Sequence, residues 1–268
     1  MNVLLNNGHT MPMIGLGMYD MYGQEAERAI VRAIEIGYRL IDTASMYQNE
    51  SELGNAWQRS GLKREDIFIT TKVNNSDQGY DQTLKALEVS LAKLKTDYVD
   101  LYLLHWPLKL TRKQTWKAME KIWKEGRAKS IGVANFLIPF LTEHYEYTEI
   151  IPAVNQVEFS PYLFLKDLLV HCQDKNIKMQ AYSPLLRGLK LKDAKLVSIA
   201  AKYNRTTAQI KLRWCIQHGV CPIPKSVNPV RLLENFQVFD FQITEDDMRK
   251  LDSFNEGLRV VDDPMTML

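Results

Sequence analysis

Asp42, Lys72 and His105 each follow a run of mostly apolar residues, and each can carry charge or move a proton. A phenol, Tyr47, lies shortly beyond the first of them. Each residue alone has an ordinary interpretation: a helix cap, a solvated lysine, a structural histidine or a surface tyrosine. Four complementary groups near three successive segment ends instead favour a catalytic site.

These four groups fit together as a site that protonates an oxyanion. A buried Lys72 needs a counter-ion, which Asp42 on the neighbouring strand can supply. A cationic Lys72 close to Tyr47 is expected to lower the pKa of the phenol, so that Tyr47 can give its proton to a carbonyl oxygen. His105 can hydrogen-bond and orient the same oxygen. Because protein side chains do not donate hydride, a reduction at this site needs a cofactor.

The chain alternates between buried strands and amphipathic helices. Apolar residues at helical spacing predict helices such as 25–36 and 80–94. A β-hairpin is expected over residues 3–14, where Asn7-Gly8 is a turn signal, and an extra helix is expected at 244–254. Eight strands are expected after the hairpin: 14–19, the stretch ending at 41, 67–72, 99–105, 128–135, 153–158, 177–182 and 220–224.

This alternation implies parallel strands, in either a closed (β/α)8 TIM barrel or an open doubly wound sheet. Eight units without a linker or a change in composition favour the α/β barrel, as a single domain over residues 1–268. The open sheet has weak support, because Gly15-Leu16-Gly17 lacks the third glycine of a dinucleotide-binding turn. In a barrel the polar strand ends converge on one mouth, and here they are Asp42, Lys72, His105, Asn135, Glu158 and Tyr182.

The composition is that of an ordinary globular protein, with 46% hydrophobic and 25% charged residues. The net charge of +2 is too small to argue for a nucleic acid or a membrane surface as a partner. Cys172, Cys215 and Cys221 show no CxxC pattern and no zinc-ligand spacing, so no metal is expected. The N-terminus lacks signal-peptide features, and no apolar run approaches the roughly 20 residues of a membrane span. We therefore expect a cytoplasmic protein.

Three separated motifs resemble those of the aldo-keto reductases, in the order of that family. Residues 37–50 with Leu53-Gly54 resemble the first signature, residues 101–107 the histidine strand, and residues 223–235 the C-terminal cofactor signature. The resemblance covers the whole chain and is closest to short-tailed, prokaryote-like members. It implies a barrel enzyme that reduces aldehydes or ketones to alcohols with NADPH and uses Tyr47 as general acid. The catalytic tetrad of the family falls on Asp42, Tyr47, Lys72 and His105.

The resemblance also implies where NADPH would lie across the barrel mouth. It assigns cofactor binding to Asn135, Gln156, Tyr182, Ser183, Leu185, Lys225, Ser226, Arg231, Glu234 and Asn235. Asn135 and Gln156 would hold the nicotinamide carboxamide, and Tyr182 would stack on the ring. Ser183 and Leu185 would lie at the pyrophosphate. The last five residues of the set would hold the adenosine 2′-phosphate and the adenine, with the two cations on the phosphate.

Several positions depart from the family pattern. Ala134 replaces the usual serine, which removes one hydrogen bond to the carboxamide, on the order of 1 kcal/mol. Leu186 and Arg187 change the pyrophosphate segment. Because the C-terminal tail is short, we expect an open substrate pocket that includes Tyr19 and Trp106. Such a pocket favours broad aldehyde reduction, and we expect a monomer.

Two other functions remain open. A non-catalytic protein on the same fold, either a dinucleotide sensor or a channel-associated subunit, could keep an intact tetrad. NADPH oxidation with a simple aldehyde would separate such a protein from an enzyme. A barrel glycosidase with Asp42 and Glu158 as its carboxylate pair would leave Lys72, Lys225 and Arg231 unexplained, and it needs no dinucleotide.

Overall fold

Eight strands form one sheet in which neighbouring strands are parallel. The computed structural model describes residues 1–267; residue 268, the last of the predicted domain, lies outside the described part. The sheet runs in chain order through β3 (Leu16–Gly17), β4 (Leu40–Asp42), β5 (Phe68–Val73), β6 (Val99–Leu104), β7 (Ala128–Ala134), β8 (Val154–Glu158), β9 (Lys178–Tyr182) and β10 (Cys221–Pro222). All residues of β4, β5 and β6 are buried, as expected for parallel strands that are covered on both faces.

The sheet closes into a barrel between its first and last strands. The backbone N–H of Gly15 donates to the carbonyl oxygen of Pro222 at 3.1 Å, and that of Gly17 donates to Pro224 at 3.2 Å. A Cβ atom at Gly17 would lie 2.7 Å from the carbonyl oxygen of Ile223, so glycine is required for this close approach. The closure confirms the predicted (β/α)8 barrel.

The two strands at this seam are shorter than the sequence predicted. β3 and β10 contain two residues each, in place of the expected strands over 14–19 and 220–224. Pro222 and Pro224 have no N–H to donate, so the β10 segment cannot continue a full ladder of hydrogen bonds. The donors that close the seam therefore come from the glycines of the other segment.

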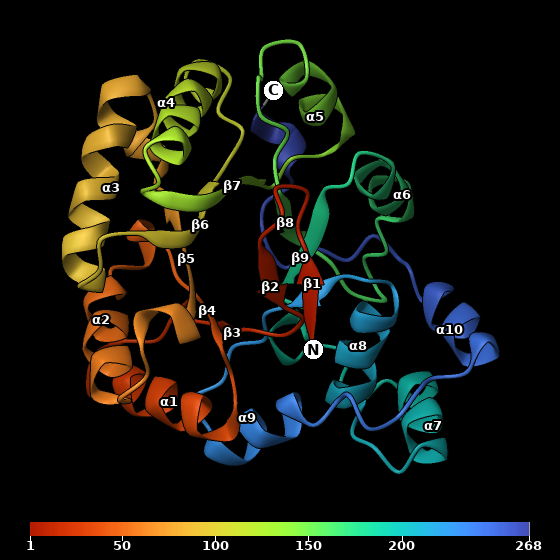
Figure 1. Cartoon of the computed structure of the whole chain (residues 1–268). Coiled ribbons are helices and arrows are strands. Elements are labelled where there is room, and N and C mark those ends of the chain that lie inside the picture. The colour runs from red at the N-terminus through yellow and green to blue at the C-terminus, as the bar shows by residue number, and fades with distance from the viewer. Residues whose placement is uncertain (268) are drawn as a thin grey trace.

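The predicted N-terminal hairpin is present and covers one end of the barrel (Figure 1). β1 (Asn2–Leu4) pairs antiparallel with β2 (Thr10–Pro12). The turn includes Gly8 at a φ of 86°, which glycine adopts without strain. Leu5 and Met11 pack in one apolar cluster with Leu40 and Phe68, the first residues of β4 and β5. The hairpin thus closes the amino end of the strands and leaves their carboxyl ends for a site.

Helices surround the barrel (Figure 1). They are α1 (Gly23–Ile36), α2 (Glu50–Arg59), α3 (Tyr80–Leu94), α4 (Arg112–Lys124), α5 (Ile138–His144), α6 (Lys166–Asp174), α7 (Ala194–Lys202), α8 (Thr207–Gln217), α9 (Pro229–Phe236) and α10 (Glu245–Asp252). The residues that α1 buries are spaced three or four apart: Ala26, Ala29, Ile30, Ala33 and Ile34. α10 is the predicted extra C-terminal helix. Across residues 1–267, no helix is both long and apolar enough to cross a lipid bilayer.

The chain beyond α10 returns to the carboxyl end of the barrel. It ends in a 3₁₀ turn, Pro264–Met267, on the side of the molecule where α5 lies (Figure 1). On the way, the backbone N–H of Val260 donates to Oε1 of Glu158, the last residue of β8, at 2.7 Å. The tail therefore passes over the end of β8.

Candidate active site

The predicted quartet of Asp42, Tyr47, Lys72 and His105 meets at the carboxyl end of the barrel. Asp42 is the last residue of β4, Lys72 lies near the end of β5, and His105 directly follows β6. A 3₁₀ turn, Ser45–Tyr47, brings the phenol back over these strand ends. The ring centroids of Tyr47 and His105 lie 5.8 Å apart, edge to face.

The ammonium of Lys72 is buried and hydrogen-bonded on three sides. Nζ donates to Asp42 Oδ1 at 2.6 Å, to the carbonyl oxygen of Thr43 at 2.8 Å and to the hydroxyl oxygen of Tyr47 at 3.5 Å. The side chain of Lys72 is 0% exposed and that of Asp42 is 2% exposed. Burial raises the pKa of Asp42 and lowers the pKa of Lys72, and the attraction between the two charges opposes both shifts. An ammonium has three N–H donors, so this geometry is that of a charged lysine facing a carboxylate.

The structure corrects the expected pKa of Tyr47. The positive charge of Lys72 was expected to lower it, but burial raises the pKa of the phenol well above its ordinary value, and the charge of Asp42 raises it further. Asp42 lies 2.6 Å from the ammonium, so the pair presents little net positive charge to the phenol. Because Lys72 donates to the hydroxyl oxygen, the proton of Tyr47 must point away from the lysine. Tyr47 is therefore a protonated phenol, not a tuned phenolate.

His105 is a neutral imidazole beside this phenol. Burial, with a smaller contribution from the charge of Lys72, lowers the pKa of His105 from 6.5 to about 3. Its Nδ1 is buried and has no hydrogen-bond partner in the described part of the chain. A neutral imidazole carries one N–H donor, and this one keeps that state throughout the physiological pH range.

A buried amide on β8 continues the network from Asp42. Gln156 donates through Nε2 to Asp42 Oδ2 at 2.7 Å and to Gln180 Oε1 at 2.6 Å. Sequence reasoning placed Gln156 at the site but missed Gln180. Its position could have indicated this, because Gln180 lies two residues before Tyr182 on β9 and alternate residues of a strand point to the same face.

A second buried amide lies beside it, after β7. Asn135 donates through Nδ2 to the backbone carbonyl of His105 at 2.9 Å, and its Oδ1 accepts from the hydroxyl of Tyr182 at 2.8 Å. Its φ of 66° is in the left-handed region, which asparagine tolerates better than most residues. The three residues predicted to hold the nicotinamide, Asn135, Gln156 and Tyr182, are therefore hydrogen-bonded directly to each other or to the tetrad.

The predicted pyrophosphate segment leaves β9 in a tight turn. The N–H of Leu186 donates to the carbonyl of Ser183 at 2.8 Å, and Leu185 packs against the core. Ser183, Leu186 and Arg187 have φ values of 47°, 53° and 51°, which are uncommon for residues other than glycine. The guanidinium of Arg187 lies 5.4 Å from the centroid of the Tyr19 ring. Backbone strain thus accumulates at the predicted cofactor edge, as it does at many ligand-binding segments.

Two residues were predicted to line a substrate pocket. The ring of Tyr19 lies 5.3 Å from that of Tyr47, edge to face, and is 49% exposed. Trp106 directly follows His105, is half-buried, and its backbone carbonyl accepts from Gln78 Nε2 at 2.8 Å. Of the two predicted pocket residues, Tyr19 is the one whose ring packs against the ring of Tyr47.

The predicted phosphate cluster surrounds the start of α9. Asn228 caps this helix, with Oδ1 accepting from the N–H groups of Val230 at 2.9 Å and Arg231 at 3.1 Å. Ser226 is buried, and its Oγ accepts from the N–H of Asn228 at 3.1 Å. Lys225 and Arg231 are exposed, and neither forms an ion pair within residues 1–267. Unpaired cations at a helix N-terminus suit a phosphate dianion.

The two predicted adenine residues lie further along α9. Glu234 Oε1 accepts from Thr206 Oγ1, the N-cap of α8, at 2.6 Å. Asn235 is 3% exposed. The structure therefore holds the carboxylate of Glu234 against the start of α8 and buries the amide of Asn235.

The carboxylate pair that a glycosidase would need is engaged in other contacts. Asp42 accepts from Lys72 and Gln156 through its two oxygens. Glu158 Oε1 accepts from the tail at Val260, while Oε2 is buried without a partner among the described residues. Burial raises the pKa of Glu158. Nothing in this arrangement presents two carboxylates to a shared substrate.

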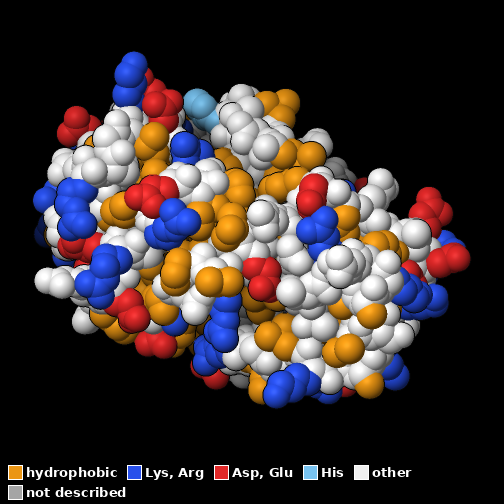
Figure 2. Space-filling view, turned by 90° about the horizontal axis from the view of Figure 1, so that it is seen from below, with side chains coloured by type: hydrophobic (Ala, Val, Ile, Leu, Met, Phe, Trp, Pro, Cys, Tyr) orange, Lys and Arg blue, Asp and Glu red, His pale blue; other side chains and the backbone are white. Residues whose placement is uncertain are grey.

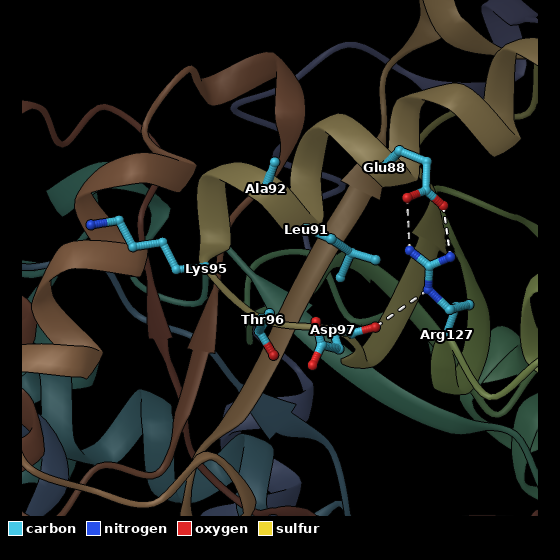
Figure 3. A pocket seen from close by; sticks show the side chains of 7 residues that line it. All are labelled: Glu88, Leu91, Ala92, Lys95, Thr96, Asp97 and Arg127. Carbon is cyan, nitrogen blue, oxygen red and sulfur yellow. Dashed lines mark hydrogen bonds and ion pairs between the residues drawn. The ribbon is translucent and has the colours of Figure 1, made fainter.

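A surface hollow of about 490 Å³ lies away from the quartet, at the carboxyl end of α3 (Figure 3). Arg127 lines this hollow. Its guanidinium pairs with both carboxylate oxygens of Glu88, each at 2.8 Å, and its Nε donates to the backbone carbonyl of Asp97 at 3.3 Å. The side chain of Lys95 points away from this group in the same view. The hollow includes none of the predicted site residues, and its arginine is already satisfied by the protein.

The surface charge agrees with the small net charge of the sequence. Figure 2 shows acidic and basic side chains interspersed over the face seen from below, without a broad patch of one sign on that face. In the described part of the chain, no group of three or more His, Cys, Asp or Glu side chains is arranged to hold a metal ion.

The residues present fit a nicotinamide dinucleotide. At the tetrad, Oε1 of Gln156 accepts no hydrogen bond from residues 1–267, and the free oxygen of this largely buried side chain suits an N–H donor. At α9, the exposed cations Lys225 and Arg231 suit a phosphate. Between them lies the strained turn after β9. The arrangement can therefore hold a carbonyl compound and a reducing cofactor next to a phenol proton.

Known proteins share this sequence and this fold. The sequence model of the aldo/keto reductase family matches residues 13–256. The glyoxal reductase of Bacillus subtilis (strain 168) is 47% identical over 267 residues, which cover 99% of this chain and 97% of that protein. The crystal structure of an aldo/keto reductase from Brucella melitensis superposes with a TM-score of 0.92 at 44% identity, covering 95% of this chain and 99% of that one. The Bombyx mori aldo-keto reductase in complex with NADP has a TM-score of 0.93 at 36% identity, covering 98% and 95%. As its motifs predicted, the chain belongs to the aldo-keto reductase family and is an oxidoreductase.

Proposed function

We propose that the protein reduces aldehydes or ketones to alcohols with NADPH and that Tyr47 is the general acid. The observation that carries the proposal is the direction of the Lys72–Tyr47 hydrogen bond. Lys72 donates to the hydroxyl oxygen at 3.5 Å, which leaves the phenol proton for a ligand. The family and the NADP complex of the Bombyx mori relative support the choice of cofactor. When bound, NADPH supplies the hydride.

The high pKa of Tyr47 is compatible with this role. A carbonyl oxygen becomes strongly basic only as it turns into an alkoxide, so a phenol that holds its proton until then is a suitable acid. The ammonium of Lys72 stabilises the phenolate that remains after proton transfer. The reverse reaction needs the phenolate at the start, so burial of Tyr47 favours reduction over alcohol oxidation near neutral pH.

The neutral His105 orients the substrate in this proposal. Its imidazole lies edge to face with Tyr47, and its single N–H can hydrogen-bond the same carbonyl oxygen. Because its pKa lies at about 3, it donates a hydrogen bond without competing as the acid. Asp42 acts through Lys72, since it keeps the buried ammonium charged.

The cofactor is proposed to lie across the mouth from the tetrad to α9. Asn135 and Gln156 would bind the carboxamide, with Tyr182 against the ring; Ser183 and Leu185 would lie at the pyrophosphate. The unpaired cations Lys225 and Arg231, with Ser226, support a 2′-phosphate site at the start of α9, and Glu234 and Asn235 would contact the adenine. The glyoxal reductase of Bacillus subtilis suggests glyoxal and simple aldehydes as the first substrates to test.

The test is Tyr47→Phe, assayed by NADPH oxidation with glyoxal and an aromatic aldehyde. Turnover is expected to fall by a factor of about 10³ to 10⁴, the size of a lost general acid, while the NADPH dissociation constant changes by less than about 2-fold. Equal loss of turnover and cofactor binding would show that Tyr47 is not the acid. If the wild-type protein binds NADPH but turns over no carbonyl compound, the non-catalytic alternative holds instead.

A further inference from the structure

We infer that Arg187, in the turn after β9, binds the negatively charged group of a substrate, so that the protein favours aldehydes that carry a carboxylate over neutral aldehydes of similar size. Arg187 is a specificity residue and takes no part in the transfer of hydride or proton. The inference rests on the proposed function, because the proposed function places the substrate carbonyl at Tyr47. It adds the chemical class of the molecule to which this carbonyl belongs.

The side chain of Arg187 lies beside the proposed substrate pocket. Its guanidinium carbon is 5.4 Å from the centre of the Tyr19 ring, and the centre of the Tyr19 ring is 5.3 Å from that of Tyr47. One exposed aromatic ring therefore links the cation to the phenol that is proposed to protonate the carbonyl. A benzaldehyde with a carboxylate on its ring has its two polar groups separated in a similar way, by one aromatic ring.

The turn that carries Arg187 is held by its neighbours. Leu186 is 0% exposed, and its N–H donates to the carbonyl of Ser183 at 2.8 Å. The N–H of Gly188 donates to the carbonyl of Leu185 at 3.0 Å. Arg187 itself is exposed and has a φ of 51°. The protein thus fixes the backbone on both sides of the arginine and leaves its guanidinium accessible to a ligand.

The charge of Arg187 is not neutralised by an ion pair. Within residues 1–267 its guanidinium forms neither an ion pair nor a hydrogen bond. Glu158 is close enough to respond to it: burial raises the pKa of this carboxyl, while a hydrogen bond from the tail and nearby arginines, Arg187 among them, oppose the shift. Glu158 is 1% exposed, however, and its Oε1 accepts from the N–H of Val260 at 2.7 Å. The tail holds this carboxyl, and the arginine remains available.

A guanidinium in this position suits a carboxylate. Arginine presents N–H donors in one plane that match the two oxygens of a carboxylate, and its contact with the Tyr19 ring favours one orientation of the side chain. Lys72, the cation beside the phenol, is buried against Asp42 and offers no such site. A substrate carboxylate would therefore be bound by Arg187 while the carbonyl oxygen faces the proton of Tyr47.

The experiment compares 3-carboxybenzaldehyde with its methyl ester, two aldehydes that differ in charge at one group. Oxidation of NADPH gives kcat/KM for each aldehyde with the wild-type protein and with Arg187→Gln, which removes the charge and keeps a polar side chain. The ratio of kcat/KM, acid over ester, should fall by about 5- to 10-fold in the variant, and the change should appear mainly in KM. Comparing this ratio between proteins cancels the difference in intrinsic reactivity of the two aldehydes.

Lys190→Gln is the matched control, because it removes the same charge from the same segment. The ammonium of Lys190 is paired with Oε1 of Glu256 at 2.7 Å, so this variant should keep the ratio within about 2-fold of wild type. Arg187→Glu reverses the charge and should lower the ratio further than Arg187→Gln does. Raising the salt concentration from about 20 to about 300 mM should lower kcat/KM for the acid and leave that for the ester unchanged, because exposed charges are screened.

Three results would contradict these expectations in different ways. A ratio that stays unchanged in folded Arg187 variants overturns the inference and leaves the proposed function intact. An unchanged ratio together with a rise of about 10-fold or more in the NADPH dissociation constant also overturns it, and would assign the arginine to the cofactor pyrophosphate instead. A wild-type protein that binds NADPH but reduces neither aldehyde, and not glyoxal, overturns the proposed function itself.

Discussion

Two groups of cations lie at the mouth of this barrel, and their surroundings differ. Lys72 is 0% exposed and forms hydrogen bonds with Asp42, Thr43 and Tyr47. Lys225 and Arg231, at the start of α9, are exposed and form no ion pair in the described structure. A buried ammonium must be satisfied by the protein itself, whereas an exposed cation is hydrated until a ligand replaces the water. The comparison separates a cation that the protein itself satisfies from cations that remain available to a ligand.

Removing the buried cation should have the largest effect. Lys72→Met leaves Asp42 as a buried carboxylate without its counter-ion, which should lower the free energy of unfolding by about 3–5 kcal/mol and abolish measurable turnover. Urea denaturation measures the stability. The double variant Asp42→Asn/Lys72→Met removes the orphaned charge and should regain most of the stability but none of the activity. A single variant as stable as wild type would mean that the pair is not charged in the folded protein.

Two buried histidines, one inside the candidate site and one outside it, should make the stability of the protein depend on pH. Burial lowers the pKa of His105 and of His144 from 6.5 to about 3, and His144 lies in α5, outside the site. Each is neutral when folded, so its contribution to stability is complete above pH 6.5 and is lost as the pH falls toward 3. The slope is about 1.4 kcal/mol per pH unit for each histidine.

Replacing either histidine should change the slope of stability against pH by the same amount. Only the replacement of His105 should also change the turnover. His144→Asn and His105→Asn should each reduce the slope of stability against pH by about 1.4 kcal/mol per unit between roughly pH 5.5 and 4. At pH 7, His105→Asn should also lower turnover, by about 10² or more, whereas His144→Asn should change it by less than about 2-fold. Urea denaturation at a series of pH values, with assays at pH 7, tests both. Slopes that match wild type would show that the two histidines are already protonated in the folded state.

Removing an exposed cation should affect binding and leave stability unchanged. Arg231→Ala should raise the dissociation constant of NADPH by about 10- to 100-fold and that of NADH by less than about 3-fold, because only NADPH carries the 2′-phosphate. Arg127→Ala is the matched control, since this arginine is paired with Glu88 away from the site and should alter neither constant. Fluorescence titration gives both values. If NADPH and NADH weaken alike, the cluster at α9 does not read the 2′-phosphate.

The smallest effect is expected at Ala134, which is 1% exposed next to the amide of Asn135. Ala134→Ser restores the hydroxyl donor usual in the family and should tighten NADPH binding by about 3- to 10-fold. In the proposed pose the added donor meets the carbonyl oxygen of the carboxamide. The reduced 3-acetylpyridine analogue of NADPH, in which a methyl ketone replaces the carboxamide, has the same carbonyl oxygen. Both dinucleotides should therefore gain equally, and a gain confined to NADPH would contradict the proposed pose of the carboxamide.

Sequence periodicity and local signals determined much of this protein. The alternation of buried runs with amphipathic stretches predicted the (β/α)8 barrel, and Asn7-Gly8 predicted the hairpin. The strand ends of β4, β5 and β6 identified Asp42, Lys72 and His105, because parallel strands bring their carboxyl ends together. The seam between β3 and β10 was less predictable, because glycine and proline weaken the strand pattern where the barrel closes.

The tertiary structure alone decided the electrostatics of the site. The sequence suggested that Lys72 would lower the pKa of Tyr47, but the folded protein neutralises that lysine with Asp42 and buries the phenol, which raises the pKa instead. The hydrogen bonds of Gln180 with Gln156 and of the tail at Val260 with Glu158 also appear only in the folded structure, because the partners are distant along the chain. A pKa and the direction of a hydrogen bond depend on what surrounds a group on every side, and the spacing of residues along a chain does not contain that information.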